Sequence, residues 1–223
     1  MEIKAIAHIY TDFKEKFGIP RQFGRVPSLM GKIVFEPQFS NPEAIRGLSE
    51  FSHIWLIFGF NEAEYKEGTM TVRPPRLGGN TRVGVFASRA PFRPNSLGLS
   101  CVKIERIEQG EILVSGVDIL DGTPIYDIKP YIPYCDSIPD ASGSFAEENK
   151  NHSLDVEFPE ELLKIIPEDR QKAVIECLAD DPRPSYQEDG RIYSMAFADY
   201  DIHFRVENEK LTVMSINNKK SNG

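Results

Sequence analysis

Cysteine and histidine are scarce in this sequence, and neither is arranged for disulfide or metal chemistry. The three cysteines, Cys101, Cys135 and Cys177, lie far apart and form no Cys-x-x-Cys pair, so we expect free thiols in a reducing compartment. The four histidines are also scattered, and no pair has the spacing of metal ligands. The sequence therefore argues against a disulfide framework and against a bound metal.

Long hydrophobic runs are also missing. The longest continuous apolar run covers residues 54–58, which is far too short to cross a bilayer. The first ten residues, MEIKAIAHIY, contain neither a basic leader nor an apolar signal core. We therefore expect a cytoplasmic protein with no membrane attachment.

Two common nucleotide-binding signatures, Gly-x-Gly-x-x-Gly and the P-loop, do not occur. Strands predicted at 98–107, 112–120 and 125–128 are separated only by short turns at 108–110 and 121–124. A doubly wound parallel sheet needs a helix between successive strands, and these connections are too short to contain one. The strand order instead favours an antiparallel meander that closes into a barrel.

The 223 residues are enough for one or two domains. The strand pattern occupies residues 1–137, and residues 138–158 are small and polar without periodicity, as in a linker. Residues 159–223 combine two helical patterns with three alternating strands. We therefore predict a mainly β protein in which an antiparallel, non-Rossmann barrel is followed by a small α+β C-terminal domain.

Negative charge is absent from residues 72–100, although the whole chain has a net charge of −8. This arginine stretch contains no Asp, Glu or Lys, but it contains Arg73, Arg76, Arg82, Arg89 and Arg93. The guanidinium fork suits carboxylates and phosphates, and the prolines between the arginines stiffen the backbone. Solvated arginines on ordinary surface loops are the alternative. Five arginines without a counter-charge favour an anion-binding surface.

A second notable segment is DGTPIYDIKPYIPY, from Asp121 to Tyr134. Asp121 and Gly122 form a turn signal, whereas Asp127 and Lys129 flank one residue and therefore share a strand face. Two interpretations are equally supported by this spacing. Asp127 and Lys129 form a surface ion pair of little energetic value, or Asp121 binds a cofactor while Asp127 holds an arginine.

Together these segments resemble the TsaA-like family, which includes the TrmO-type tRNA (adenine-N6)-methyltransferases. The matching segments occur in the family's order over nearly the whole chain, with only mild departures at Ser88 and Ser96. They are FGIPRQ (17–22), FSHIW (51–55), VRPPRLGGN (72–80), GVFASRAPFRPNSLGLS (84–100), DGTPIYDIKPYIPY (121–134) and DPRPSY (181–186).

The resemblance implies a homodimeric barrel enzyme that transfers a methyl group from S-adenosylmethionine. The implied target is N6 of threonylcarbamoyladenosine, next to the anticodon of tRNA. The implied cofactor-binding residues are Phe23, Gly24, Arg25, Asn61, Glu62, Arg89, Leu99, Asp121, Gly122, Thr123, Pro124 and Ile125. The catalytic candidates are Arg89, Asp121 and Asp127, and the two aspartates are candidates for removing the N6 proton. The candidates for contacting tRNA are Arg73, Arg76, Arg93, Asn95, Lys129, Tyr131, Asp181, Arg183 and Tyr186.

The DPRPSY segment has a simple alternative explanation, because prolines often follow the end of a helix. Its two prolines also hold Arg183 on a stiff backbone, and Tyr186 offers a ring that can stack on an unpaired anticodon-loop base. We expect this loop to reach a barrel active site, in its own subunit or in the partner subunit, and to contact tRNA rather than the cofactor.

Two other classes of protein remain open. The first is a non-catalytic barrel that binds an anionic ligand or RNA as a sensor. The second is a hydrolase of a small acidic substrate with Cys135 as nucleophile, although no histidine lies near Cys135 in the sequence. Binding of S-adenosylmethionine separates these classes from the methyltransferase, because only the methyltransferase requires it.

Overall fold

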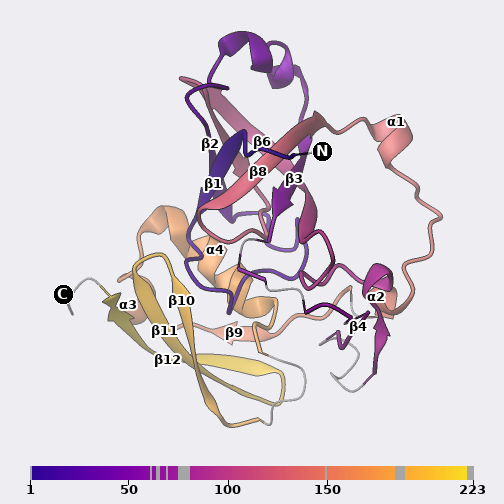
Figure 1. Cartoon of the computed structure of the whole chain (residues 1–223). Helices are drawn as coiled ribbons and strands as arrows, with labels where there is room; N and C mark the ends of the chain where they lie inside the picture. Colours follow the sequence, from indigo (N-terminus) through magenta and orange to yellow (C-terminus); the bar gives the residue numbers. More distant parts are fainter. Residues whose placement is uncertain are drawn as a thin grey trace.

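The computed structural model describes residues 2–60, 62–63, 66–68, 70–74, 81–148, 150–183 and 189–219. Six antiparallel strands close a barrel in the order β1-β2-β7-β6-β3-β8 (Figure 1). Their bounds are β1 Ala7–Thr11, β2 Met30–Phe35, β3 His53–Gly59, β6 Leu97–Glu108, β7 Glu111–Ser115 and β8 Thr123–Pro130. The predicted antiparallel barrel is therefore confirmed.

Alternating burial along the strands explains why these segments form a barrel. On β3, Ile54, Leu56 and Phe58 point inward and are almost completely buried. On β6, Ser100 and Val102 occupy the corresponding inward positions. Each inward side chain fills the interior, so the barrel is packed rather than hollow.

Strand β7 ends earlier than the predicted strand at 112–120. Its last residue is Ser115, and Gly116 follows with a φ of 75°, a left-handed conformation that glycine adopts without strain. Residues 116–120 therefore leave the sheet and cross one end of the barrel before β8 begins. This early exit directs the side chain of Asp118 toward a cavity described below.

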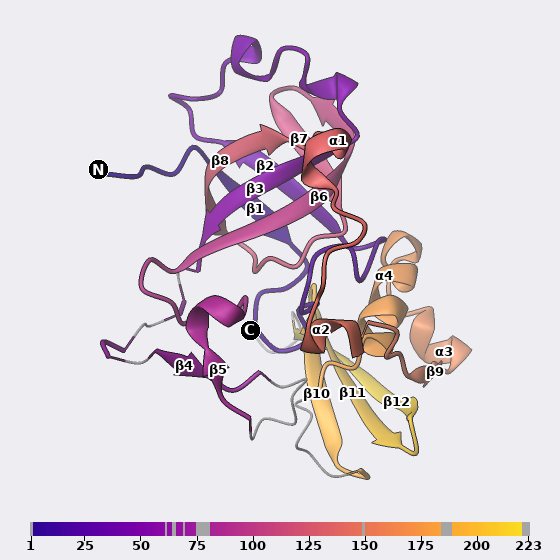
Figure 2. The ribbon, with the colours of Figure 1, turned by 90° about the vertical axis from the view of Figure 1, so that its right-hand side faces the viewer.

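Part of the arginine stretch forms an arm outside the barrel. It contains the two-stranded sheet of β4 (Thr71–Val72) and β5 (Val83–Gly84), followed by the 3-10 turn η4 (Val85–Ala87) and then β6 (Figure 2). Between β2 and β3 the chain forms two 3-10 turns, η1 (Pro42–Ile45) and η2 (Leu48–Glu50). Asn41 caps the first turn, because its side chain accepts a hydrogen bond from the Glu43 N–H.

The C-terminal unit is a four-stranded sheet covered by helices. Its strands are ordered β10-β11-β12-β9, and β9 runs parallel to β12. The bounds are β9 Asp155–Glu157, β10 Ile192–Phe197, β11 Tyr200–Glu207, β12 Lys210–Asn218, α3 Glu160–Leu163 and α4 Glu168–Ala179. Because β9 pairs with β12, the last part of the predicted linker at 138–158 belongs to this sheet. The chain before it contains α1 (Pro133–Asp136) and α2 (Phe145–Glu148).

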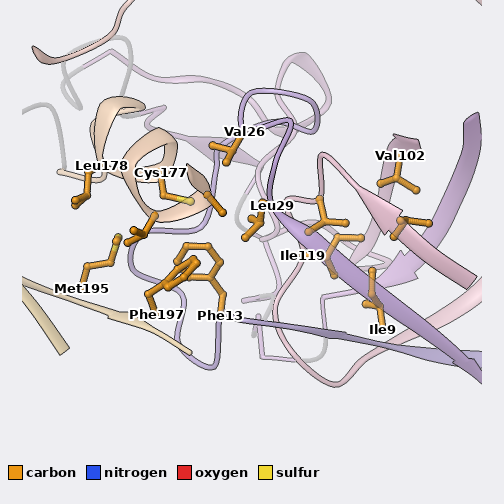
Figure 3. Packing of buried hydrophobic residues seen from close by; sticks show 14 of the residues in the cluster. Ile9, Phe13, Val26, Leu29, Val102, Ile119, Cys177, Leu178, Met195 and Phe197 are labelled. Carbon is orange, nitrogen blue, oxygen red and sulfur yellow. The ribbon is translucent and has the colours of Figure 1, made fainter. Parts of the chain in front are cut away.

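One hydrophobic core joins the barrel to the C-terminal unit. Phe13, which follows β1, is fully buried and packs edge-on against Phe197 of β10 at a centroid distance of 5.5 Å. Cys177 and Leu178 of α4 lie on one side of this pair, and Leu29 continues the contact into the barrel (Figure 3). Because the two units share this core, we expect them to unfold together. Among the described residues, no helix has the length and apolar character needed to cross a bilayer.

Candidate functional site: an arginine-lined cavity at one end of the barrel

A cavity of about 360 Å³ lies where β3 ends and β6 begins. Phe58 of β3 is opposite Gly98 of β6, and a Cβ atom added at Gly98 would lie 2.3 Å from the Phe58 ring. Because any Cβ atom at position 98 would clash with the Phe58 ring, only glycine allows the ring to lie there and form part of the cavity wall. The lining residues are Pro20, Arg21, Gln22, Phe58, Phe60, Ser88, Arg89, Pro91, Arg93, Leu97, Gly98, Leu99, Ser100 and Asp118.

Arg89 is held at the mouth of this cavity by the loop that follows β1. Its Nη1 donates a hydrogen bond of 2.7 Å to Gln22 Oε1, and its guanidinium lies 5.4 Å from the centre of the Phe23 ring. The Phe23 ring packs edge-on against Trp55 of β3. The Arg93 side chain donates hydrogen bonds from Nη1 to the backbone carbonyls of Ser88 and Ala90. The arginines are thus oriented by uncharged acceptors, which leaves their charge uncompensated by these contacts.

Asp118 places a carboxylate in the same cavity. Ser100 Oγ donates a hydrogen bond of 2.6 Å to its Oδ1, and the backbone N–H groups of Asp118 itself and of Phe23 also favour the charged carboxylate. Burial raises the pKa of Asp118 to about 6, while the Ser100 hydrogen bond and the positive charge of Arg89 oppose this shift. The cavity thus combines three guanidinium groups, those of Arg21, Arg89 and Arg93, with one carboxylate whose pKa is raised.

The backbone geometry around Asp118 depends on two glycines. Gly24 and Gly116 both have positive φ angles, 72° and 75°, and the Gly24 N–H donates to the Gly116 carbonyl at 2.8 Å. A Cβ atom at Gly116 would lie 3.4 Å from the Gly24 Cα. This close approach of two chain segments fixes the Phe23 N–H beside Asp118.

The C-terminal unit holds the outer wall of the cavity through side chains of the loop at 20–25. Arg21 Nη2 donates a hydrogen bond to the Arg183 carbonyl. Burial lowers the pKa of Arg21, although the nearby carboxylates of Asp180 and Asp181 act in the opposite direction. Arg25 Nε donates to Asp180, and its two remaining nitrogens donate to carbonyls of the linker segment at 150–152. The conformation of this loop therefore depends on the C-terminal unit.

Four of the predicted cofactor residues lie in or beside the cavity. Arg89 and Leu99 line it, and Phe23 and Gly24 adjoin it. Arg25 instead points toward Asp180 and the linker, with its side chain only 19% exposed. Glu62 lies apart from the cavity lining, beside Lys16, whose Nζ donates to its carbonyl. Asn61 lies outside the described residues.

The predicted segment at 121–125 lies at the corner where β8 meets β1. Asp121 Oδ1 accepts a hydrogen bond of 2.9 Å from the Thr11 N–H, and the Gly122 N–H donates to the Ile9 carbonyl. Thr123 and Ile125 are buried inside the barrel. Residues 121–125 are not part of the cavity lining. Asp121 therefore has an observed structural role in joining the two strands.

Asp127 and Lys129 form the ion pair that their spacing suggested. Their carboxylate and ammonium groups are 2.9 Å apart, and both side chains are about half exposed or more. Asp127 also accepts from the Ile128 N–H. Tyr131 packs against Trp55, with 5.8 Å between the ring centres. The structure thus places this group on the outside of the barrel, apart from the cavity.

The predicted tRNA residues are distributed over several surfaces. Arg93 lines the cavity, whereas Arg73 and Asn95 are exposed in the arm and in the turn before β6. The Arg183 side chain is only 13% exposed and contacts Asp181 and Asp189 at 2.9 and 3.1 Å. These carboxylates raise the pKa of Arg183, the Asp181 hydrogen bond most of all. Arg76 and Tyr186 lie outside the described residues.

Sequence reasoning missed Asp118, Ser100, Gln22 and Arg21 as cavity residues. A signal for Asp118 was present, because it is the one charged residue inside the apolar segment ILVSGVDIL. A buried carboxylate is costly and is seldom placed inside a strand without a partner or a function. No comparable signal existed for Gln22 or Ser100, whose roles depend on strands that meet only in the folded barrel.

A second hollow of about 350 Å³ lies on the β11–β12 hairpin, and it is lined only by polar and charged residues. Two of these residues, Arg205 and Lys210, are paired with Glu207 and Glu157. It lacks the apolar wall that small-molecule sites usually have. The exposed thiol of Cys135 lies on α1 and is not among the residues that line either hollow.

Comparison with known proteins agrees with the geometry of both units. The tRNA-methyltransferase O N-terminal domain model matches residues 8–137, and the TrmO C-terminal domain model matches residues 151–219. The Escherichia coli tRNA (adenine(37)-N6)-methyltransferase is 39% identical over 228 residues, covering 96% of this chain and 97% of that protein. A Pseudomonas aeruginosa relative, named as the S-adenosylmethionine-dependent methyltransferase RcsF, is 42% identical, and the match covers 91% of both chains.

A crystal structure of TrmO from Pseudomonas aeruginosa has a TM-score of 0.82 and 35% identity with this chain. That match covers 98% of this chain and 97% of the other, so it includes the barrel, the linker and the C-terminal sheet. The two family models together also span both units. This chain belongs to the tRNA-methyltransferase O family.

Proposed function

We propose that this protein methylates N6 of adenine 37 in tRNA with S-adenosylmethionine as the methyl donor. The observation that carries the proposal is the end-to-end match to the E. coli tRNA (adenine(37)-N6)-methyltransferase. The names of relatives from Eikenella corrodens and from three mammals describe the same activity. Because tRNA is decoded in the cytoplasm, we place the protein there.

The cavity has the chemistry that S-adenosylmethionine needs. Phe58, Phe60 and Leu99 offer apolar surface for an adenine ring and a methyl group, and the volume is within the range of small-molecule sites. Arg89 suits the carboxylate of the cofactor. The residues present therefore fit this cofactor. The predicted contacts at 121–125, Glu62 and Arg25 lie outside the cavity lining, and a cofactor-bound crystal structure would test whether the cofactor also reaches them.

When bound, the cofactor supplies a methyl group activated by its positively charged sulfur. The main task of the protein is then to align this group with the accepting nitrogen. Arg89, held by Gln22 and Phe23, is positioned to fix an anionic group at the cavity mouth. Phe58 and Leu97 reduce the access of water to the site.

We propose threonylcarbamoyladenosine as the form of adenine that is methylated. Its threonyl carboxylate is an anion that Arg93, at the cavity edge, is able to bind. The exposed Arg73 and Lys129, together with Arg76 and Asn95, would contact phosphates, which position tRNA without reading its sequence. Tyr131 and Tyr186 would stack on unpaired bases.

Calorimetry with S-adenosylmethionine, followed by methylation of tRNA with and without the threonylcarbamoyl group, tests the proposal. We expect cofactor binding and methylation only of the modified tRNA. Methylation of both tRNAs would leave the enzyme class intact and remove the preference. Cofactor binding without methylation of either tRNA would instead support a sensor.

We predict that Arg183→Ala lowers tRNA affinity by about tenfold, the effect of one lost charge-assisted contact. Affinity for S-adenosylmethionine should change little, because the cofactor is proposed to bind at the barrel. The ion pairs with Asp181 and Asp189 are also lost, so the melting temperature is measured alongside. An unchanged tRNA affinity with a lower melting temperature would show that Arg183 is purely structural.

We also propose a symmetric homodimer, since a two-fold dimer is the commonest assembly and the family resemblance implies one. The exposed Phe86 and Phe92 beside the cavity provide apolar surface for such a contact. Light scattering that gives the mass of one chain at working concentration would exclude it.

A further inference from the structure

We propose that Asp118 accepts the proton that leaves N6 when the base is methylated, so that it is the general base of the reaction. This inference rests on the proposed function, and it assigns a residue that the sequence did not single out. A carbamoylated N6 is amide-like, so its lone pair is a poor nucleophile until the N–H proton is removed.

The two aspartates suggested by the sequence are engaged elsewhere in the fold. The Asp121 carboxylate accepts from the Thr11 N–H at the corner of β1 and β8. Asp127 lies outside the barrel, where it pairs with Lys129 and its side chain is 47% exposed. Neither residue lines the cavity. A proton acceptor has to lie within hydrogen-bond reach of the reacting nitrogen or of one bridging water.

Among the described residues that line the cavity, Asp118 is the only carboxylate. The other polar side chains there are arginines, Gln22 and two serines, and none of these takes up a proton near neutral pH. Ser100 Oγ orients the Asp118 carboxylate, and the hydrogen bond from the Gly24 N–H to the Gly116 carbonyl fixes the segment just before Asp118 against the loop at 20–25. Its position is therefore determined before any ligand enters.

The electrostatic setting suits a base. Burial raises the pKa of Asp118 to about 6, so the group is ionised at pH 7 yet more basic than an exposed aspartate. The charged groups that line the same cavity are Arg21, Arg89 and Arg93, and the Arg89 charge partly opposes the shift. The Ser100 hydrogen bond opposes it as well.

The proposed step balances in atoms and charge. The N6–H bond breaks, its electron pair stays on nitrogen and forms the bond to the methyl carbon, and the proton moves to a carboxylate oxygen of Asp118. The electron pair of the broken carbon–sulfur bond returns to sulfur, which becomes neutral. Asp118 then releases the proton to solvent.

Asp118→Asn is the main test, because the amide oxygen is still able to accept from Ser100 and from the Phe23 N–H. We expect the single-turnover methylation rate to fall at least about 100-fold, a typical contribution of a general base. Affinities for S-adenosylmethionine and for tRNA should stay within about threefold of wild type, because the fold and the remaining contacts are kept. Asp140→Asn, an exposed change in the linker, is the matched control.

Two readouts do not depend on a loss of activity. Because the pKa of Asp118 is raised in the folded state, its ionised form destabilises the fold above about pH 6. Asp118→Asn should therefore have a higher melting temperature than wild type at pH 8, and the difference should vanish near pH 4. A carboxyl-carbon NMR titration of the wild type should show one aspartate with a pKa near 6 that is missing from the variant.

Ser100→Ala provides a complementary test. Removing this donor should raise the pKa of Asp118, so the acidic limb of the pH–rate profile should move to higher pH. The inference is overturned if Asp118→Asn methylates at the wild-type rate, or if its whole loss is a loss of cofactor affinity. It is also overturned if Asp127→Asn loses the rate instead. A wild-type protein that does not methylate tRNA overturns the proposed function itself.

Discussion

Replacing Arg89 with alanine is expected to lower tRNA methylation by about 100-fold or more, and replacing it with lysine should also cause a loss. A charged hydrogen-bonding group at a buried anion typically contributes about 2–5 kcal/mol when its partner remains in place. Lysine keeps the charge but cannot reproduce the planar fork that bonds Gln22 and lies over Phe23. Both variants should also bind S-adenosylmethionine more weakly, as measured by calorimetry.

Arg82→Ala is the matched control, because Arg82 comes from the same arginine stretch. It is exposed, and its Nη1 donates a hydrogen bond of 3.4 Å to the Thr71 hydroxyl on the arm. Its activity should stay close to wild type. Full methylation by Arg89→Lys would show that the cavity arginine acts only through its charge, and full methylation by Arg89→Ala would remove Arg89 from the site.

Phe13→Ala should destabilise the shared core of the chain by about 3–5 kcal/mol. Phe13 is fully buried and packs edge-on against Phe197, so its removal opens a cavity between the barrel and the C-terminal unit. Because both units contribute to this core, urea unfolding followed by fluorescence and circular dichroism should show one transition shifted to lower urea concentration.

Tyr134→Ala is the control for loss of an aromatic side chain, since Tyr134 is 90% exposed. It should change the free energy of unfolding by no more than about 0.5 kcal/mol. Two separate transitions in the wild-type protein, with only the second moved by Phe13→Ala, would contradict a shared core. That result would also weaken the view that the C-terminal unit holds the cavity wall.

The contact between the barrel and the C-terminal unit matters for function because part of it is made by the loop at 20–25. Arg21 and Arg25 of this loop are bonded to the C-terminal unit, while Gln22 and Phe23 between them contact Arg89. Alternate residues of one short segment thus face the C-terminal unit and the cavity. A disturbance of the C-terminal unit is therefore transmitted to the mouth of the cavity over a few residues.

Much of the architecture was determined by the sequence itself. Period-two alternation and turns too short for helices predicted the antiparallel barrel, because both depend on local geometry. The arginine stretch, with its prolines and its lack of counter-charge, predicted an anion-binding surface, since charge composition is visible without a fold, and the structure places Arg89 and Arg93 from this stretch in the cavity lining. The order of the motifs carried the family resemblance, which the domain matches confirm.

Only the tertiary structure decided which carboxylate faces the arginines. Asp118, Asp121 and Asp127 lie within ten residues of one another, and only the last two were catalytic candidates from the sequence. The left-handed turn at Gly116 ends β7 early and directs Asp118 into the cavity, whereas strand pairing directs Asp127 outward and holds Asp121 against Thr11. The direction of a side chain after a strand depends on backbone turns and on partners more than eighty residues away in the chain, such as Phe23. Such partners are brought together only by the closure of the barrel.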